Sequence, residues 1–306
     1  MSRSLRTAVS AVLVALSCLL VPFGTLAAWA AYDLTDTGRY VTTMAPLASN
    51  PAVRDAVADT VGDGVAREAG VDDGVNRLFI RAAVRSFTAT RAYRTAWDAG
   101  NEAAHTAVMR ALHDDSADRD THALTVDLAA VTTPLKRQLT ADHMPFADQV
   151  PVEHTRVALL PPDELAALRK GYQVLDVAGF WLPLAAVVFA VAGIAVAAVR
   201  RRAITATALG TALGGAFLGL AVAIGRRLTL ADLPDETRRP AVGAVYDALT
   251  ATLRTASWLL LAVGLAVAAA TWLTHPRSLV VRLLRRRRAS AAPSPTPPPE
   301  PTRVRA

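Results

Sequence analysis

The sequence lacks charged residues in four long runs, which cover residues 7–32, 177–199, 203–225 and 255–274. An α-helix rises about 1.5 Å per residue, so roughly 20 apolar residues cross the ~30 Å hydrocarbon core of a bilayer. Each run is long enough to do so. The pattern predicts a mainly α protein with four transmembrane helices, and it excludes an ordinary soluble chain.

The sequence also lacks the residues and motifs that several kinds of chemistry need. Cys18 is the single cysteine, so no disulfide can form within the chain. No Gly-x-Ser-x-Gly turn and no glycine-rich phosphate loop occurs. The four runs hold no ionisable group of the kind that carries ions or protons across a membrane. We therefore expect a protein that is not an enzyme and that uses no cofactor and no metal.

Basic residues flank the runs and predict the orientation of the chain. They form three clusters, at Arg3 and Arg6, at Arg200 to Arg202, and at Arg277, Arg282 and Arg285 to Arg288. Because Lys and Arg near the ends of a span favour the cytoplasmic side, all three clusters are expected there. This puts residues 1–6 and the tail, 275–306, in the cytoplasm of a multi-pass cell-membrane protein. Residues 33–175 form an extracytoplasmic domain, and residues 226–254 form an extracytoplasmic loop.

The formal charge of +7 does not indicate nucleic-acid binding when the chain is divided at these boundaries. Residues 33–175 hold 20 Asp and Glu against 15 Lys and Arg, a net of 15 − 20 = −5. The basic excess lies in the flanking segments, where the lipid bilayer is the expected partner. Anionic-lipid contacts are expected at Arg285, Arg286, Arg287 and Arg288. Beyond them, the proline-rich end of the tail is predicted to be disordered.

The first run has two interpretations. Ala28-Trp29-Ala30 resembles a small-x-small cleavage site, as in a signal peptide that is removed. The run is longer than a normal signal core, however, and Trp29 and Tyr32 suit the membrane interface. We favour an uncleaved signal anchor.

The extracytoplasmic domain is predicted to be mostly helical. Asn50-Pro51 reads as an N-cap followed by proline at the first helical position, and Gly62, Gly64 and Gly70 are expected to break the chain. Leu78 and Phe79 belong to a second apolar pattern with helical spacing. The strongest helix covers residues 90–112.

Two short segments, residues 123–127 and 155–159, are rich in β-formers and could pair as a two-stranded ribbon. A helix over 128–139 is expected between them. A final helix starting near residues 161–163 is expected to run into the second span. In the 226–254 loop, an apolar stripe is expected to pack against the extracytoplasmic domain as a collar. It consists of Val242, Val245, Leu249 and Leu253.

A second stripe, Trp97, Asn101 and His105, repeats every four residues and so lies on one helix face. It is either a binding or sensing site, in which His105 changes charge between about pH 5 and 8, or a structural stripe. In the structural interpretation Trp97 is core, and the two polar residues satisfy backbone groups of a neighbouring segment near Asp127. We favour the structural interpretation.

The residues 97–112 and 124–131 together resemble a group of actinobacterial integral membrane proteins of Streptomyces type. That group has an N-terminal anchor, a helical extracytoplasmic domain with a Trp-x3-Asn-x3-His pattern, and a helical membrane bundle. The resemblance covers most of the chain up to the tail. It supports the architecture and implies no particular activity.

The third run is rich in glycine, with Gly210 and Gly214 four residues apart and Gly215 and Gly219 likewise. Small residues at this spacing allow close contact between membrane helices. Packing within one four-helix bundle is favoured over a dimer face.

Two classes of function remain after these exclusions. The first is a non-enzymatic envelope protein whose outer domain is a binding, interaction or sensing module, with another envelope protein or a second copy as partner. The alternative is an accessory subunit of a membrane transport or export complex. A metal-dependent outer enzyme centred on His105 ranks below both.

Overall fold

The computed structural model describes residues 3–68, 70, 74–113, 124–127, 129–141, 156–160 and 162–274. Helices dominate the described part of the chain, as the sequence predicts. The α-helices are α1 (Arg3–Asp33), α2 (Thr37–Met44), α3 (Pro51–Glu68), α4 (Gly74–Thr88), α5 (Arg91–His113), α6 (Ala129–Ala141), α7 (Pro162–Val196), α8 (Arg200–Ala231), α9 (Arg239–Leu249) and α10 (Ala251–Leu273). Two 3₁₀ helices, η1 (Ala45–Ser49) and η4 (Glu236–Arg238), and two strands, β1 (Leu124–Asp127) and β2 (Arg156–Leu160), complete the described elements.

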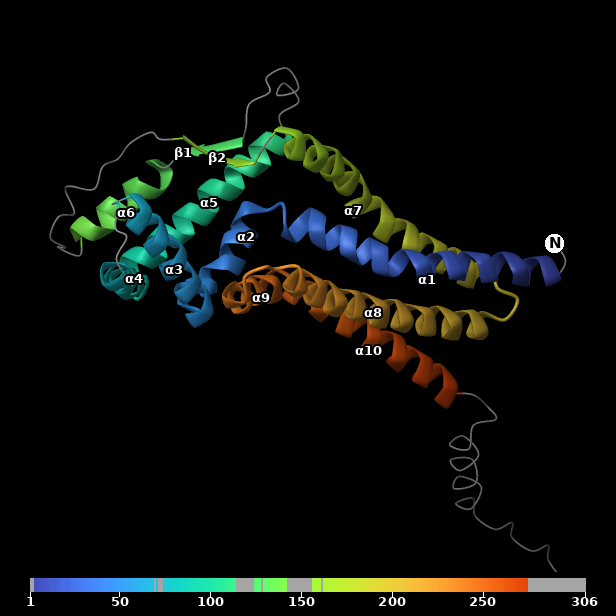
Figure 1. Cartoon of the computed structure of the whole chain (residues 1–306). Helices are drawn as coiled ribbons and strands as arrows, with labels where there is room; N and C mark the ends of the chain where they lie inside the picture. Colours follow the sequence, from blue (N-terminus) through green and yellow to red (C-terminus); the bar gives the residue numbers. More distant parts are fainter. Residues whose placement is uncertain are drawn as a thin grey trace, which may run out of the picture.

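Four helices are long and apolar enough to cross a membrane, so the chain is a multi-pass membrane protein. They are α1, the part of α7 from Leu168 to Val196, α8 and α10. Their ends differ from the charge-free runs. In particular, α8 continues to Ala231 through Arg226 and Arg227, because arginine is a good helix former. Figure 1 shows the four helices side by side, with the N-terminus at the end farthest from α2 to α6.

Helices α1 and α7 pack along their length through small residues. Ser10 Oγ donates to Gly193 O at 2.7 Å, and Ser17 Oγ donates to Ala186 O at 2.8 Å. A Cβ on Gly24 would lie 3.0 Å from the backbone nitrogen of Pro183. These three α1 positions are seven residues apart, so they follow one stripe of the helix. The small side chains bring the two backbones close together.

The glycines of α8 serve two different neighbours. A Cβ on Gly210 would overlap Cys18, and one on Gly214 would lie 3.2 Å from Pro22 Cδ, both on α1. On the other side, a Cβ on Gly215 would lie 2.7 Å from Ser257 O of α10, and Gly219 also faces Ser257. Helix α8 therefore lies between α1 and α10. Both small-residue pairs are used for packing inside this one bundle, the arrangement favoured from the sequence.

Helices α2 to α6 and the two strands lie together at one end of the bundle, and we call them the head domain (Figure 1). Asn50 caps α3 as predicted, its Oδ1 accepting from the backbone N–H of Ala52 at 3.0 Å. The predicted break at Gly62 and Gly64 is wrong, since α3 continues to Glu68. Gly62 instead permits close packing, because a Cβ there would lie 2.8 Å from Arg81 Cγ of α4. The chain turns at Gly70, whose φ is +63°.

The two strands form the ribbon that the sequence predicts. β1 pairs antiparallel with β2, with Val126 opposite Val157 and Asp127 opposite Arg156. Helix α6 lies between them in sequence. Helix α7 starts at Pro162 and continues without interruption into the membrane span, also as predicted.

Candidate functional site

The Trp97–Asn101–His105 stripe of α5 faces the segment that leaves the first span. His105 is 8% exposed. Its Nε2 lies 2.9 Å from Leu34 O, and its Nδ1 lies 3.0 Å from Thr37 Oγ1. Since a carbonyl oxygen only accepts, a neutral His105 donates from Nε2 to Leu34 and accepts the Thr37 hydroxyl proton at Nδ1. The ring also stacks on Tyr40, with centroids 4.4 Å apart.

Trp97 holds the other end of the same segment. Its Nε1 donates to Met44 O at 2.9 Å, and the ring packs against a core cluster that includes Met44 and Leu47. Asn101 donates to Trp97 O, within its own helix, at 2.8 Å. The stripe thus fixes both ends of α2, and we call Trp97 and His105 with α2 the α2 clamp. The expected partner near Asp127 is wrong, because the carbonyls that Asn101 and His105 bond belong to Trp97 and Leu34.

The connection between α8 and α10 packs into the head domain. Ala241, Val245 and Leu249 of α9 join the core cluster formed by Met44, Leu47 and Val53. Val245 and Leu249 agree with the predicted collar, whereas Val242 does not belong to this cluster. Leu253 departs from that prediction, because it packs into the bundle with Leu218 and Val222.

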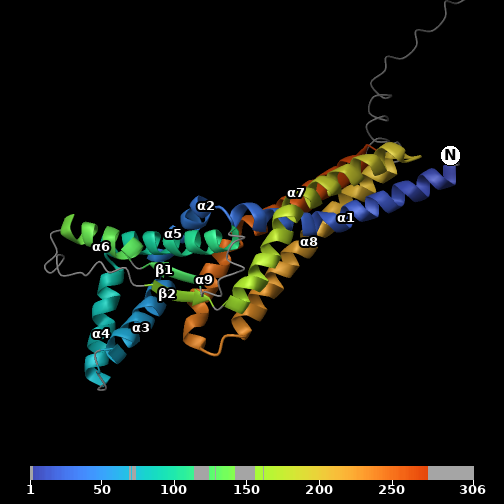
Figure 2. The same cartoon turned by 90° about the horizontal axis from the view of Figure 1, so that it is seen from above.

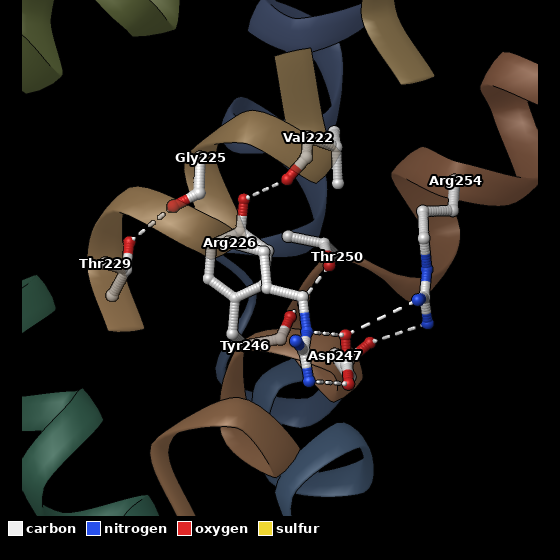
Figure 3. Close-up of polar contacts among 8 residues, drawn as sticks. All are labelled: Val222, Gly225, Arg226, Thr229, Tyr246, Asp247, Thr250 and Arg254. Atoms are coloured by element: carbon white, nitrogen blue, oxygen red, sulfur yellow. Dashed lines mark hydrogen bonds and ion pairs between the residues drawn. The ribbon is translucent and has the colours of Figure 1, made fainter. Parts of the chain in front are cut away.

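A polar cluster at the head-facing end of the bundle fixes α9 to α8 and α10 (Figure 3). Asp247 accepts from Arg226 Nε at 2.9 Å and Nη2 at 3.1 Å, and from Arg254 Nη1 at 3.4 Å. Tyr246 OH donates to Val222 O at 2.9 Å. A Cβ on Gly225 would lie 2.8 Å from that hydroxyl, so glycine gives Tyr246 its access. Arg226 near the end of α8 and Arg254 near the start of α10 therefore hold α9 through Asp247.

Helix α5 also carries polar groups that the clamp does not use. Asp98 Oδ1 and Tyr93 OH are buried, without a hydrogen-bond partner among the residues that the structure describes. Burial raises the pKa of Asp98 above its ordinary value. Burial also raises the pKa of Tyr93, and the charge of Arg54 partly opposes this.

A different surface is exposed on the α3–α4 hairpin, which projects from the head domain (Figure 2). Among the described residues of α2 to α6, the large hydrophobic side chains that stay exposed all lie on these two helices. They are Val61 at 45%, Val65 at 47%, Val75 at 78%, Leu78 at 65% and Phe79 at 73%. We call this set the hairpin face. The helical spacing of Leu78 and Phe79 is visible in the sequence, but spacing alone does not say whether the chain covers the face.

Within the described ranges, no group of three or more His, Cys, Asp or Glu side chains converges to hold a metal. The lipid-contacting candidates Arg285 to Arg288 and the proline-rich end of the tail lie outside the described residues. So does Asp72.

No family model, no curated protein and no solved structure matches this chain.

Proposed function

We propose that this is a non-enzymatic membrane protein of the cell envelope whose head domain is an interaction module, with the hairpin face as its docking surface. The observation that supports this most is the exposure of Val75, Leu78 and Phe79 on one face of α4. Exposed apolar side chains gathered on one helix face of a domain outside the bilayer are characteristic of protein–protein contact. The faces of the four spans are also apolar, but lipid covers those.

The surroundings of the hairpin face indicate the charge of the partner. A polar pocket of about 290 Å³ lies between the hairpin and η4. Its charged lining residues are Asp63, Arg67, Arg77, Arg81 and Arg238, a net of 4 − 1 = +3. Asp63 accepts from Arg81 Nε at 3.0 Å. Basic residues beside an apolar face suit a partner with an apolar ridge and acidic flanks. Another envelope protein of that character is the proposed partner.

The proposed orientation follows the arginine clusters, with both termini in the cytoplasm and the head domain outside. We propose that α1 is retained as an anchor. The buried hydrogen bonds of Ser10 and Ser17 to α7 support retention, since removal of α1 would expose those small-residue grooves to lipid. Mass spectrometry of the purified protein tests this point, because an intact chain is 32.3 kDa.

A photo-reactive amino acid placed at position 79 in living cells tests the docking surface. The expected result is a discrete adduct with an acidic protein, and its loss when Leu78→Glu is added. The control position is Thr133, which is exposed on α6. Absence of an adduct at 79, or equal adducts at both positions, would contradict the proposal. An adduct of two copies of this chain would identify a homo-oligomer instead of a second protein.

The alternative role is an accessory subunit of a transport or export complex. Support for it would come from the identity of the partner, and not from the packing of the bundle. The glycine pairs that suggested it already contact α1 and α10 in the same chain. Identification of the adduct at position 79 separates the two roles, since a permease subunit would favour the alternative.

A further inference from the structure

A cavity of about 470 Å³ lies between α1, α7 and α10, in the half of the bundle nearest the head domain. Its walls are almost wholly apolar. They include Val21, Ala28, Trp29, Pro183, Val187 and Leu260. Trp29 Nε1 is buried here without a hydrogen-bond partner among the described residues. The volume is in the range of ordinary ligand pockets, about 300–1,000 Å³.

The depth of the cavity matches one leaflet. Its α1 lining runs from Val21 to Asp33. At about 1.5 Å per residue, twelve residues of helix span roughly 18 Å. Half of the ~30 Å hydrocarbon core is about 15 Å. Because the walls belong to three membrane-spanning helices, the surrounding medium is lipid, and an acyl chain is the occupant that their chemistry suits.

A second pocket, of about 420 Å³, continues from the first towards α2. The two share Asp33 and Thr252 as lining residues. The lining of the second pocket is more polar than that of the first. Its charged residues are Asp33, Asp36 and Arg39, so it presents two carboxylates and one guanidinium. Arg39 Nη1 donates to Asp33 Oδ1 at 3.0 Å, and the Arg39 side chain remains 63% exposed.

We propose that the two pockets together bind one phospholipid with a zwitterionic primary-amine headgroup, a phosphatidylethanolamine, from the leaflet that faces the head domain. An acyl chain occupies the apolar cavity. The phosphate contacts Arg39, and the ammonium donates to Asp36. A guanidinium and a carboxylate in one pocket match the two opposite charges of this headgroup. A choline headgroup has no N–H to donate. A headgroup with only negative charge would be repelled by the carboxylates of Asp33 and Asp36.

The headgroup pocket adjoins the α2 clamp. Tyr40 lines the pocket and stacks on His105. A bound lipid therefore touches the same helix that α5 holds. This inference goes beyond the proposed docking role and needs only that α1, α7 and α10 cross a bilayer.

The test uses the full chain reconstituted in vesicles of phosphatidylcholine, phosphatidylethanolamine and phosphatidylglycerol in equal parts. The protein is then extracted in mild detergent, and the lipids retained on it are quantified by mass spectrometry. The expected result is an enrichment of phosphatidylethanolamine over phosphatidylcholine of about tenfold, the effect of one charge-assisted hydrogen bond.

Two variants should remove that enrichment. Asp36→Asn removes the carboxylate charge, while the asparagine still caps α2, where Asp36 Oδ1 accepts from Arg39 N at 2.7 Å. Ala256→Phe fills the apolar cavity from α10.

Each variant has a matched control. Asp235→Asn alters a second capping aspartate, which accepts from Thr237 N at 3.0 Å and lines neither pocket. Ala262→Phe makes the same change at an exposed α10 position away from the cavity. Both controls should keep the enrichment.

Three results would overturn the proposal. One is retention of the three lipids in proportion to their supply. Another is a preference for phosphatidylglycerol, which would assign the site to an anionic lipid. The third is equal enrichment in Asp36→Asn and the wild type, a comparison that stays decisive even if Ala256→Phe does not fold.

Discussion

The bundle and the head domain use the same residue type, glycine, for different purposes. In the bundle, a Cβ on Gly264 would lie 2.5 Å from Ala208 O and 2.7 Å from Ala212 N, so the absence of a side chain lets α10 touch the backbone of α8. In the head domain, Gly64 has open space around its Cβ position. The closest contacts of the Gly264 position in the bundle are with backbone atoms, whereas the close contact at Gly62 in the head domain is first with a side-chain atom, Arg81 Cγ.

The largest loss of stability is expected at Gly264, where the backbones of α8 and α10 are in close contact. Gly264→Leu should destabilise the protein by about 3 kcal/mol or more, because the atoms that would clash are backbone atoms, which cannot turn aside. The midpoint of thermal unfolding in detergent measures the loss.

Replacement of a glycine in the head domain should have the opposite sign. Gly64→Ala should stabilise by about 0.5–1 kcal/mol, since alanine is the better residue inside a helix. If both variants lowered the midpoint equally, the contrast between the two regions would be wrong.

The α2 clamp should show the next largest effect. His105→Ala leaves Leu34 O and the Thr37 hydroxyl without their buried partner, which should cost about 2–4 kcal/mol. The control on the same helix is His113→Ala. His113 is exposed and bonds Met109 O and Tyr172 OH, so its loss should cost less than about 1 kcal/mol. Equal losses of stability in the two variants would show that the buried hydrogen bonds of His105 contribute no more than the exposed ones of His113.

A smaller effect is expected from the hydroxyls between α1 and α7. Ser17→Ala keeps the small size that the close packing needs and removes only the bond to Ala186 O. A loss of about 0.6 kcal/mol is expected, as for hydrogen bonds between membrane helices in general. A loss several times larger would mean that the hydroxyl, and not the size of the residue, joins the two helices.

The smallest effect should come from Asp98. Burial raises its pKa in the folded state, so the folded protein binds this proton more tightly than the unfolded chain does. Stability should therefore fall as pH rises from about 4, the unfolded pKa, through the folded value. Asp98→Asn should be more stable than the wild type at neutral pH and should lose this dependence. If the free energy of unfolding of Asp98→Asn changed with pH as steeply as that of the wild type between pH 4 and 7, Asp98 would not be the cause.

The sequence predicts the bundle better than the head domain, for a physical reason. A membrane span depends on composition over about 20 residues, so charge-free runs identify α1, α7, α8 and α10 directly. The contacts of the head domain depend on distant pairs. Periodicity places Trp97 and His105 on one face, but it cannot say that Met44 and Leu34 lie opposite, since 53 and 71 residues separate the partners.

Two other features of the head domain lie beyond pattern reasoning. Gly62 reads as a helix breaker until Arg81 is known to pack against it. The apolar spacing of α4 predicts the helix correctly, yet only the structure shows that Leu78 and Phe79 are exposed. A hydrophobic stripe is the same signal whether its cover comes from the chain itself or from a partner.

Hydrogen exchange of the α2 amides tests most directly the claim that Trp97 and His105 of α5 fix both ends of α2. In the wild type, the amides of Tyr40 to Met44 should exchange nearly as slowly as those in the middle of α8 and α10, although α2 has only 8 residues. In His105→Ala, α2 should lose that protection while α8 and α10 keep theirs. Fast exchange of α2 in the wild type, or unchanged protection in the variant, would contradict the account.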